Sequence, residues 1–141
     1  MILEILAGIL FAILVILFGN AQNLSCRFYY GISLIILPVI YMTFGIFADG
    51  TGVIGQELLY GLPFIVMGIV CAITDFKYAG YIVAVFWFSH AAYDMIHPQL
   101  FTNSGVPSWY PVVCAAIDFS IGLWISYLML TGSDAEENPV V

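Results

Sequence analysis

The chain alternates between long apolar runs and short polar segments, and this pattern predicts five helices. The apolar runs cover about residues 2–19, 28–47, 53–73, 78–97 and 109–130. None of them has the period-two alternation of a barrel strand. Each has about the 20 residues that a helix needs to cross a bilayer, although the first is near the lower limit. We expect Pro98 to end the fourth helix.

The composition places these helices in a membrane. Of the 141 residues, 63% are hydrophobic and only 8% are charged, whereas a soluble domain has about 25% charged residues. In lipid, helices and closed barrels are the structures that satisfy every backbone group. The sequence therefore predicts an all-α, multi-pass protein of the cell membrane, a compact bundle of about five transmembrane helices. We expect one domain over residues 1–131 and a short acidic tail at 132–141, and such a bundle can also form homo-oligomers.

The charges predict an orientation. Arg27 and Lys77, the two basic residues, fall in the first and third connections, which lie on the same side of a five-span protein. The positive-inside rule makes that side cytoplasmic, so the amino terminus is expected outside and the carboxyl terminus inside.

A net charge of −7 with two basic residues argues against a nucleic-acid partner. Glu4 and the lack of a basic residue in the first run argue for a retained helix, not a signal peptide.

Several aromatic side chains are expected where helices leave the membrane. Tyrosine and tryptophan favour the interface because one end of the ring is apolar and the other is polar. The residues at positions of this kind are Tyr29, Tyr30, Tyr41, Tyr78, Trp109 and Tyr110. We interpret them as anchors at the membrane surface.

Ionisable side chains collect in one layer of the predicted bundle. His90, Asp94 and His97 have the spacing i, i+4, i+7 and fall within about 60° of one helix face. Counting about 1.5 Å per residue from the helix ends places them at the depth of Glu57 and Asp118, in the half of the bilayer away from both basic residues. In the predicted orientation this is the non-cytoplasmic half. A charge in hydrocarbon is costly, so these groups must pair, lose their charge or bind a cation.

A metal site is the leading hypothesis for this layer. Histidine with aspartate or glutamate is a ligand set that suits a divalent transition metal such as zinc, iron, manganese or copper. The candidate ligands are His90, Asp94, His97, Asp118 and Glu57. The two histidines are about 10 Å apart along the helix axis, so one histidine with Asp94, completed by Asp118 or Glu57, is the easier geometry. Haem ligation by His90 stays open, because a single axial histidine leaves little trace in a sequence.

Three other interpretations also stay open. The layer can relay protons or move a cation, which is a common use of acidic residues and histidine within membranes. It can act as a metal-free acid–base site on a small or lipid-soluble substrate, with His90 and Asp94 or Asp118 as the catalytic groups. Trp87, Tyr93 and Trp109 would then line the pocket. Finally, the polar side chains can simply join the helices by hydrogen bonds, while Cys114 is expected to be a small packing residue.

The polar residues also carry a resemblance. His90-x-x-x-Asp94-x-x-His97, followed by Pro107-Ser108-Trp109-Tyr110-Pro111 and then by Cys114 and Asp118, resembles an uncharacterised family of small bacterial multi-span membrane proteins, a domain of unknown function. The resemblance covers most of the chain. It implies a multi-span helical fold and implies no activity.

Overall fold

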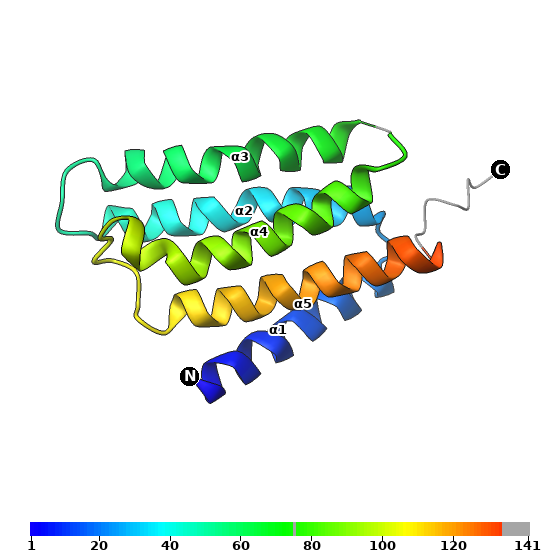
Figure 1. The fold of residues 1–141 in the computed structure, drawn as a ribbon, viewed down its shortest axis with the longest axis horizontal. Coiled ribbons are helices and arrows are strands. Elements are labelled where there is room, and N and C mark those ends of the chain that lie inside the picture. The colour runs from blue at the N-terminus through cyan, green and yellow to red at the C-terminus, as the bar shows by residue number, and fades with distance from the viewer. Residues whose placement is uncertain (75, 134–141) are drawn as a thin grey trace.

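The computed structural model describes residues 1–74 and 76–133, and this part of the chain folds into five α-helices without strands. The helices are α1 (Ile2–Ala21), α2 (Cys26–Ile46), α3 (Val53–Ile73), α4 (Ala79–Leu100) and α5 (Tyr110–Thr131). Each helix matches one of the predicted apolar runs to within three residues at either end. The helices form a compact bundle (Figure 1), so the predicted all-α fold is confirmed. The acidic tail predicted at 132–141 lies, from residue 134 onward, outside the described residues.

Four of these helices are long and apolar enough to cross a membrane, namely α1, α2, α3 and α5. The fourth helix along the chain, α4, has 22 residues but is the least apolar because His90, Asp94 and His97 lie on it. It packs against α5, α3 and α2. Polar side chains on such a helix can point at neighbouring helices, away from lipid.

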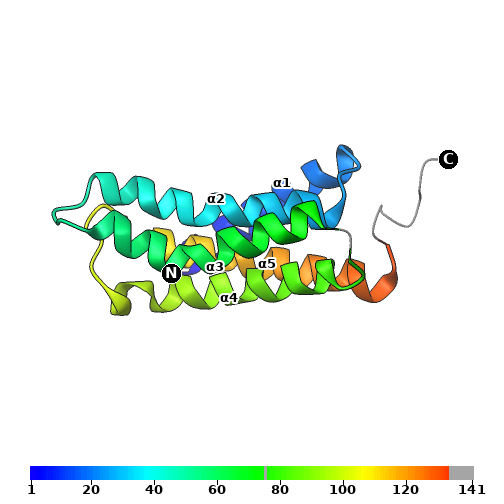
Figure 2. The same cartoon turned by 90° about the horizontal axis from the view of Figure 1, so that it is seen from above.

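The helices alternate in direction along the bundle (Figure 1). The amino terminus and the connections at 47–52 and 101–109 gather at one end, and Figure 2 shows the same arrangement from above. Arg27 and Lys77 lie toward the opposite end, where Arg27 Nη1 donates a hydrogen bond of 2.7 Å to the Thr74 carbonyl oxygen. The two basic residues are therefore at one end of the bundle.

Glycines allow two helix pairs to approach closely. A Cβ atom at Gly68 of α3 would lie 2.6 Å from the carbonyl oxygen of Gly31 in α2. A Cβ atom at Gly8 of α1 would lie 2.5 Å from the carbonyl oxygen of Val113 in α5. Small residues at helix contacts are typical of membrane bundles, because packing replaces the hydrophobic effect as the force between helices.

Two details of the prediction are wrong. Pro98 does not end α4, which continues to Leu100. A proline removes one backbone donor, whose acceptor would be the Asp94 carbonyl one turn earlier, so a helix can continue briefly beyond it. Tyr30 and Tyr41 are not at the surface but buried, at 3% and 0% exposure. The Tyr41 hydroxyl has a partner inside the bundle and does not need the interface.

Candidate metal centre

The inward face of α4 is a stripe of buried residues with helical spacing. Its members are Val83, Trp87, His90, Asp94 and His97, in steps of four, three, four and three residues. This spacing keeps the side chains on one face toward the neighbouring helices. The stripe is apolar in its first half and polar in its second half, so its polar part lies toward the 101–109 connection.

A matching stripe on α5 faces α4. It consists of Pro111, Cys114, Asp118, Ile121 and Ile125, all of them buried. Asp118 is 0% exposed and its carboxylate meets the His90 side chain across the interface between the two helices. The polar face predicted on each of these two helices from helical spacing therefore meets the other, with His90 of α4 against Asp118 of α5.

His90, Asp94 and Asp118 form one cluster, which we call the His90 centre. Each of the three side chains is 0% exposed. His90 Nδ1 lies 2.7 Å from Oδ2 of Asp118 and 3.5 Å from Oδ2 of Asp94. One potential ligand atom from each residue lies within 4.8 Å of the other two. The cluster is thus compact enough for the three residues to share one metal ion.

Each member of the His90 centre also has a buried polar atom without a hydrogen-bond partner in the described part of the chain. These atoms are His90 Nε2, Asp94 Oδ2 and Asp118 Oδ1. Buried polar atoms are nearly always paired, so three such atoms in one cluster require an explanation. The chain's two basic residues are toward the other end of the bundle and do not neutralise the two carboxylates.

A divalent cation bound between His90 Nδ1 and the two carboxylates would account for the charge and for two of the three unpartnered atoms, Asp94 Oδ2 and Asp118 Oδ1. One imidazole nitrogen and two carboxylates are ligands that zinc, iron and manganese accept. Two negative carboxylates would balance the charge of the ion, and the ion would give the unpartnered carboxylate oxygens a partner. Three protein ligands also leave a position for water or substrate, as in catalytic metal sites. The buried His90 centre can therefore hold a metal ion.

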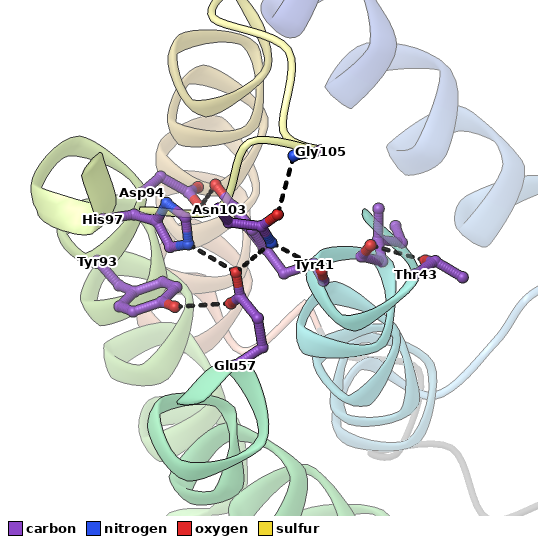
Figure 3. Close-up of polar contacts among 9 residues, drawn as sticks. Tyr41, Thr43, Glu57, Tyr93, Asp94, His97, Asn103 and Gly105 are labelled. Carbon is purple, nitrogen blue, oxygen red and sulfur yellow. Dashed lines mark hydrogen bonds and ion pairs between the residues drawn. The ribbon is translucent and has the colours of Figure 1, made fainter. Parts of the chain in front are cut away.

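Glu57 and His97 form a separate cluster closer to the 101–109 connection (Figure 3). Glu57 is 1% exposed, and its Oε1 lies 2.9 Å from His97 Nε2. Asn103 Nδ2 donates to the same oxygen at 2.7 Å, and the Tyr93 hydroxyl donates to Oε2 at 3.1 Å. The structure thus places Glu57 and His97 with each other, and not with His90, among the five residues predicted as ligands.

Tyr41 connects the two clusters. Its hydroxyl donates a hydrogen bond of 2.8 Å to Asp94 Oδ1, and its ring centroid lies 4.5 Å from that of His97. Asn103 Nδ2 also reaches the Tyr41 carbonyl oxygen, at 3.4 Å. Because Tyr41 takes one oxygen of Asp94, the other oxygen is directed to the His90 side of the carboxylate. Tyr41 therefore orients a candidate ligand.

Cys114 and Tyr110 border the His90 centre on α5. Cys114 is 3% exposed and its thiol donates a long hydrogen bond of 3.7 Å to the Tyr110 hydroxyl. The Tyr110 ring packs edge-on against Tyr41, with 5.4 Å between the centroids. Tyr110 is thus partly buried against the core, while Trp109 before it is 51% exposed, as expected of an anchor.

Sequence reasoning missed the parts played by Tyr41 and Asn103. A tyrosine near the end of an apolar run is usually an anchor, and an asparagine in a loop is usually solvated. One signal could have identified Tyr41: it continues the helical spacing of the buried residues Leu34 and Leu37 on α2. No comparable signal marks Asn103, whose burial depends on how the 101–109 connection folds over the bundle.

Comparisons of the chain with protein-family models, curated proteins and solved structures found no match. The resemblance to a family of small bacterial membrane proteins therefore stays an expectation. The fold and the cluster define the protein as an all-helical, membrane-type bundle with a buried His/Asp/Asp group.

The substitution Tyr41→Phe tests whether the Tyr41 hydroxyl orients Asp94 for metal binding. The change removes the hydrogen bond to Asp94 and keeps the ring that packs on His97. We expect metal affinity to fall about 10–100-fold, as for other residues that orient metal ligands, with the helical circular dichroism unchanged. Tyr81→Phe is the matched control, because the Tyr81 hydroxyl donates to the Met129 carbonyl oxygen near the start of α4 and the end of α5, away from the His90 centre. Equal affinities in the two variants would contradict this assignment.

Proposed function

We propose that the protein is a membrane-embedded metal protein in which His90, Asp94 and Asp118 bind one divalent transition metal for chemistry on a small or lipid-soluble substrate. The observation that carries the proposal is the convergence of three fully buried ligand-type side chains, each with an unpartnered polar atom. Burying two carboxylates and an imidazole in a membrane costs free energy unless a cation is bound or the groups share a proton.

The chemistry would follow from the open position on the ion. A divalent metal bound to water lowers the pKa of that water and can polarise a carbonyl or phosphoryl oxygen. The protein's own contribution is to hold the Asp94 carboxylate in position through the Tyr41 hydroxyl, while the metal would replace the proton between His90 Nδ1 and Asp118. The side chains around the centre are mostly aromatic, with Phe64 and Tyr93 packed on the His90 ring, and they limit the access of bulk water.

Lipid analysis of proteoliposomes tests this function. The wild-type protein, loaded with zinc, iron or manganese, would be incubated in vesicles made from a total bacterial lipid extract, and the lipids would be compared before and after by mass spectrometry. We expect one lipid class to be consumed by the metal-loaded protein. Chelator-treated protein and His90→Ala should leave that class unchanged. Equal consumption by wild type and His90→Ala would contradict a function based on this centre.

A proton relay is the second candidate, and the connection between the two clusters favours it. Polar contacts lead from Asp118 through His90 to Asp94, then to Tyr41, whose ring lies on His97 beside Glu57. Chains of acids and histidines are typical of proton paths in membranes. In vesicles with an internal pH dye, such a path would equilibrate an imposed pH gradient faster in wild type than in Glu57→Gln, with or without metal.

The orientation predicted from Arg27 and Lys77 belongs to this proposal as well. In that orientation both polar clusters lie nearer the non-cytoplasmic side, toward the end of the bundle formed by the connections at 47–52 and 101–109. The substrate would then approach from that side or from the adjoining leaflet of the bilayer.

A further inference from the structure

An apolar groove runs along the bundle between α1, α2 and α5. It has a volume of about 580 Å³ and is lined almost entirely by apolar atoms. Phe11 of α1 and Ile36 of α2 form its rims and are 54% and 51% exposed, while Trp87 of α4 is at its floor and is only 2% exposed. The volume falls within the range of about 300–1,000 Å³ that is usual for ligand sites.

The groove exists because α1 packs on α5 and diverges from α2 (Figure 1). At one end it is closed by the Tyr29 hydroxyl, which donates a hydrogen bond of 3.2 Å to the Val15 carbonyl oxygen and so joins α2 to α1. No such bond joins α1 to α2 near Phe11 or Ala7 in the described part of the chain. The other end of the groove is lined by Ala7, Trp109 and Tyr110, at the end of the bundle nearer the His90 centre.

The inner wall of the groove is also the outer wall of the His90 centre. Tyr110 and Cys114 line the groove. Cys114 is one helical turn from Asp118 on the same buried face, and Tyr110 packs on Tyr41, which holds Asp94. Cys114 and Tyr110 therefore lie both against the groove and next to the candidate metal ligands.

We propose that the groove binds one hydrocarbon chain of a membrane lipid, and that the polar end of this lipid is the substrate of the His90 centre. The proposal rests on the function proposed above and names its substrate class. The groove is continuous with the exposed apolar surface of α1 and α2, which is the surface that lipid chains cover in a membrane. A lipid seated along the groove would have its polar end beside Trp109 and Tyr110, at the end of the groove nearer the metal ligands.

The geometry also explains why a lipid, and not a water-soluble molecule, is the expected occupant. The lining offers almost no polar atoms along its length. In hydrocarbon surroundings water in such a groove would have few partners, whereas a lipid chain makes dispersion contacts along the whole wall. The partly exposed Trp109 at the end of the groove nearer the metal ligands is suited to the interface, where the polar end of a lipid lies.

Fluorescence quenching of Trp87 tests the groove directly. In the double variant Trp109→Phe/Trp124→Phe, Trp87 is the remaining tryptophan of the chain's three. This protein would be reconstituted in phosphatidylcholine vesicles with brominated or unbrominated acyl chains. We expect Trp87 to lose most of its emission in the brominated lipid, although it is 2% exposed, because an acyl chain lies against it in the groove.

Groove-filling variants supply the comparison. Ile36→Phe or Val113→Phe, each added to the double variant, should restore most of the Trp87 emission by occupying the place of the lipid chain. Val85→Phe is the matched control, since Val85 is 59% exposed on α4 and does not line the groove. Equal quenching in the Ile36, Val113 and Val85 variants, or no quenching of Trp87 at all, would overturn the proposal.

The same measurement separates the groove from the metal function. Quenching needs no metal and should persist in His90→Ala. Quenching without any metal binding would leave the groove as a lipid site and remove the proposed chemistry. Metal binding without quenching would leave the metal centre and remove the lipid substrate.

Discussion

Asp118→Ala is expected to weaken the binding of zinc by at least about 100-fold, because the change removes a ligand and not only a residue that orients one. Asp118 supplies one of the two carboxylates of the His90 centre and is 0% exposed. Without it, one imidazole and one carboxylate remain, which is fewer than the three protein ligands of usual catalytic sites. Competition with a fluorescent zinc chelator in detergent measures the affinity.

Two further variants make the Asp118 result specific. Asp118→Asn keeps the size of the side chain and removes its charge, so it should weaken zinc binding in the same direction. Ser120→Ala is the control on the same helix, because the Ser120 hydroxyl donates a hydrogen bond to the Ala116 carbonyl oxygen within α5 and not to the His90 centre. If Asp118→Ala bound zinc as tightly as Ser120→Ala, Asp118 would not be a ligand.

Glu57→Ala is expected to be the most destabilising of the substitutions considered, lowering the free energy of unfolding by about 2–4 kcal/mol. The Glu57 carboxylate holds His97, Asn103 and the Tyr93 hydroxyl together inside the bundle. Removing it leaves those buried groups without their partner and releases the 101–109 connection from α3. Unfolding in mixed micelles with increasing SDS, followed by circular dichroism, measures the loss.

Glu57→Gln distinguishes loss of hydrogen bonds from loss of charge. Glutamine keeps an oxygen that can accept from Asn103 or Tyr93, so its cost should be clearly smaller than that of alanine. Gln56→Ala, at the preceding and exposed position, should change little. If Glu57→Ala were no less stable than Gln56→Ala, the cluster would not hold the connection to the bundle.

The fold could be predicted from the sequence because five apolar runs of membrane length can form few structures other than transmembrane helices. The position of His90, Asp94 and Asp118 in one layer could also be predicted, since helical spacing and depth follow from the sequence alone. The prediction that His90 and His97 are too far apart to share an ion agrees with their separate places beside Asp118 and Glu57.

The residues that contact His90, Asp94 and Asp118 could not be predicted, because they depend on how the helices pack against one another. Which helix faces which depends on crossing angles and on contacts such as Gly31 with Gly68, and a single sequence does not define them. Tyr41 was assigned to the interface because its polar end needs a partner, and that partner, Asp94, is 53 positions away. The groove depends on the divergence of α1 from α2, which no local pattern indicates.

The number of divalent metal ions per chain tests the central claim most directly. It would be measured by elemental mass spectrometry on detergent-purified protein, made without a histidine tag or chelators. The proposed function predicts about one ion per chain in the wild type, as for a mononuclear site, and almost none in His90→Ala. Wild-type protein that retains no ion after loading with zinc, iron, manganese and copper in turn would contradict it, and the His90 centre would then be a proton-sharing or packing cluster.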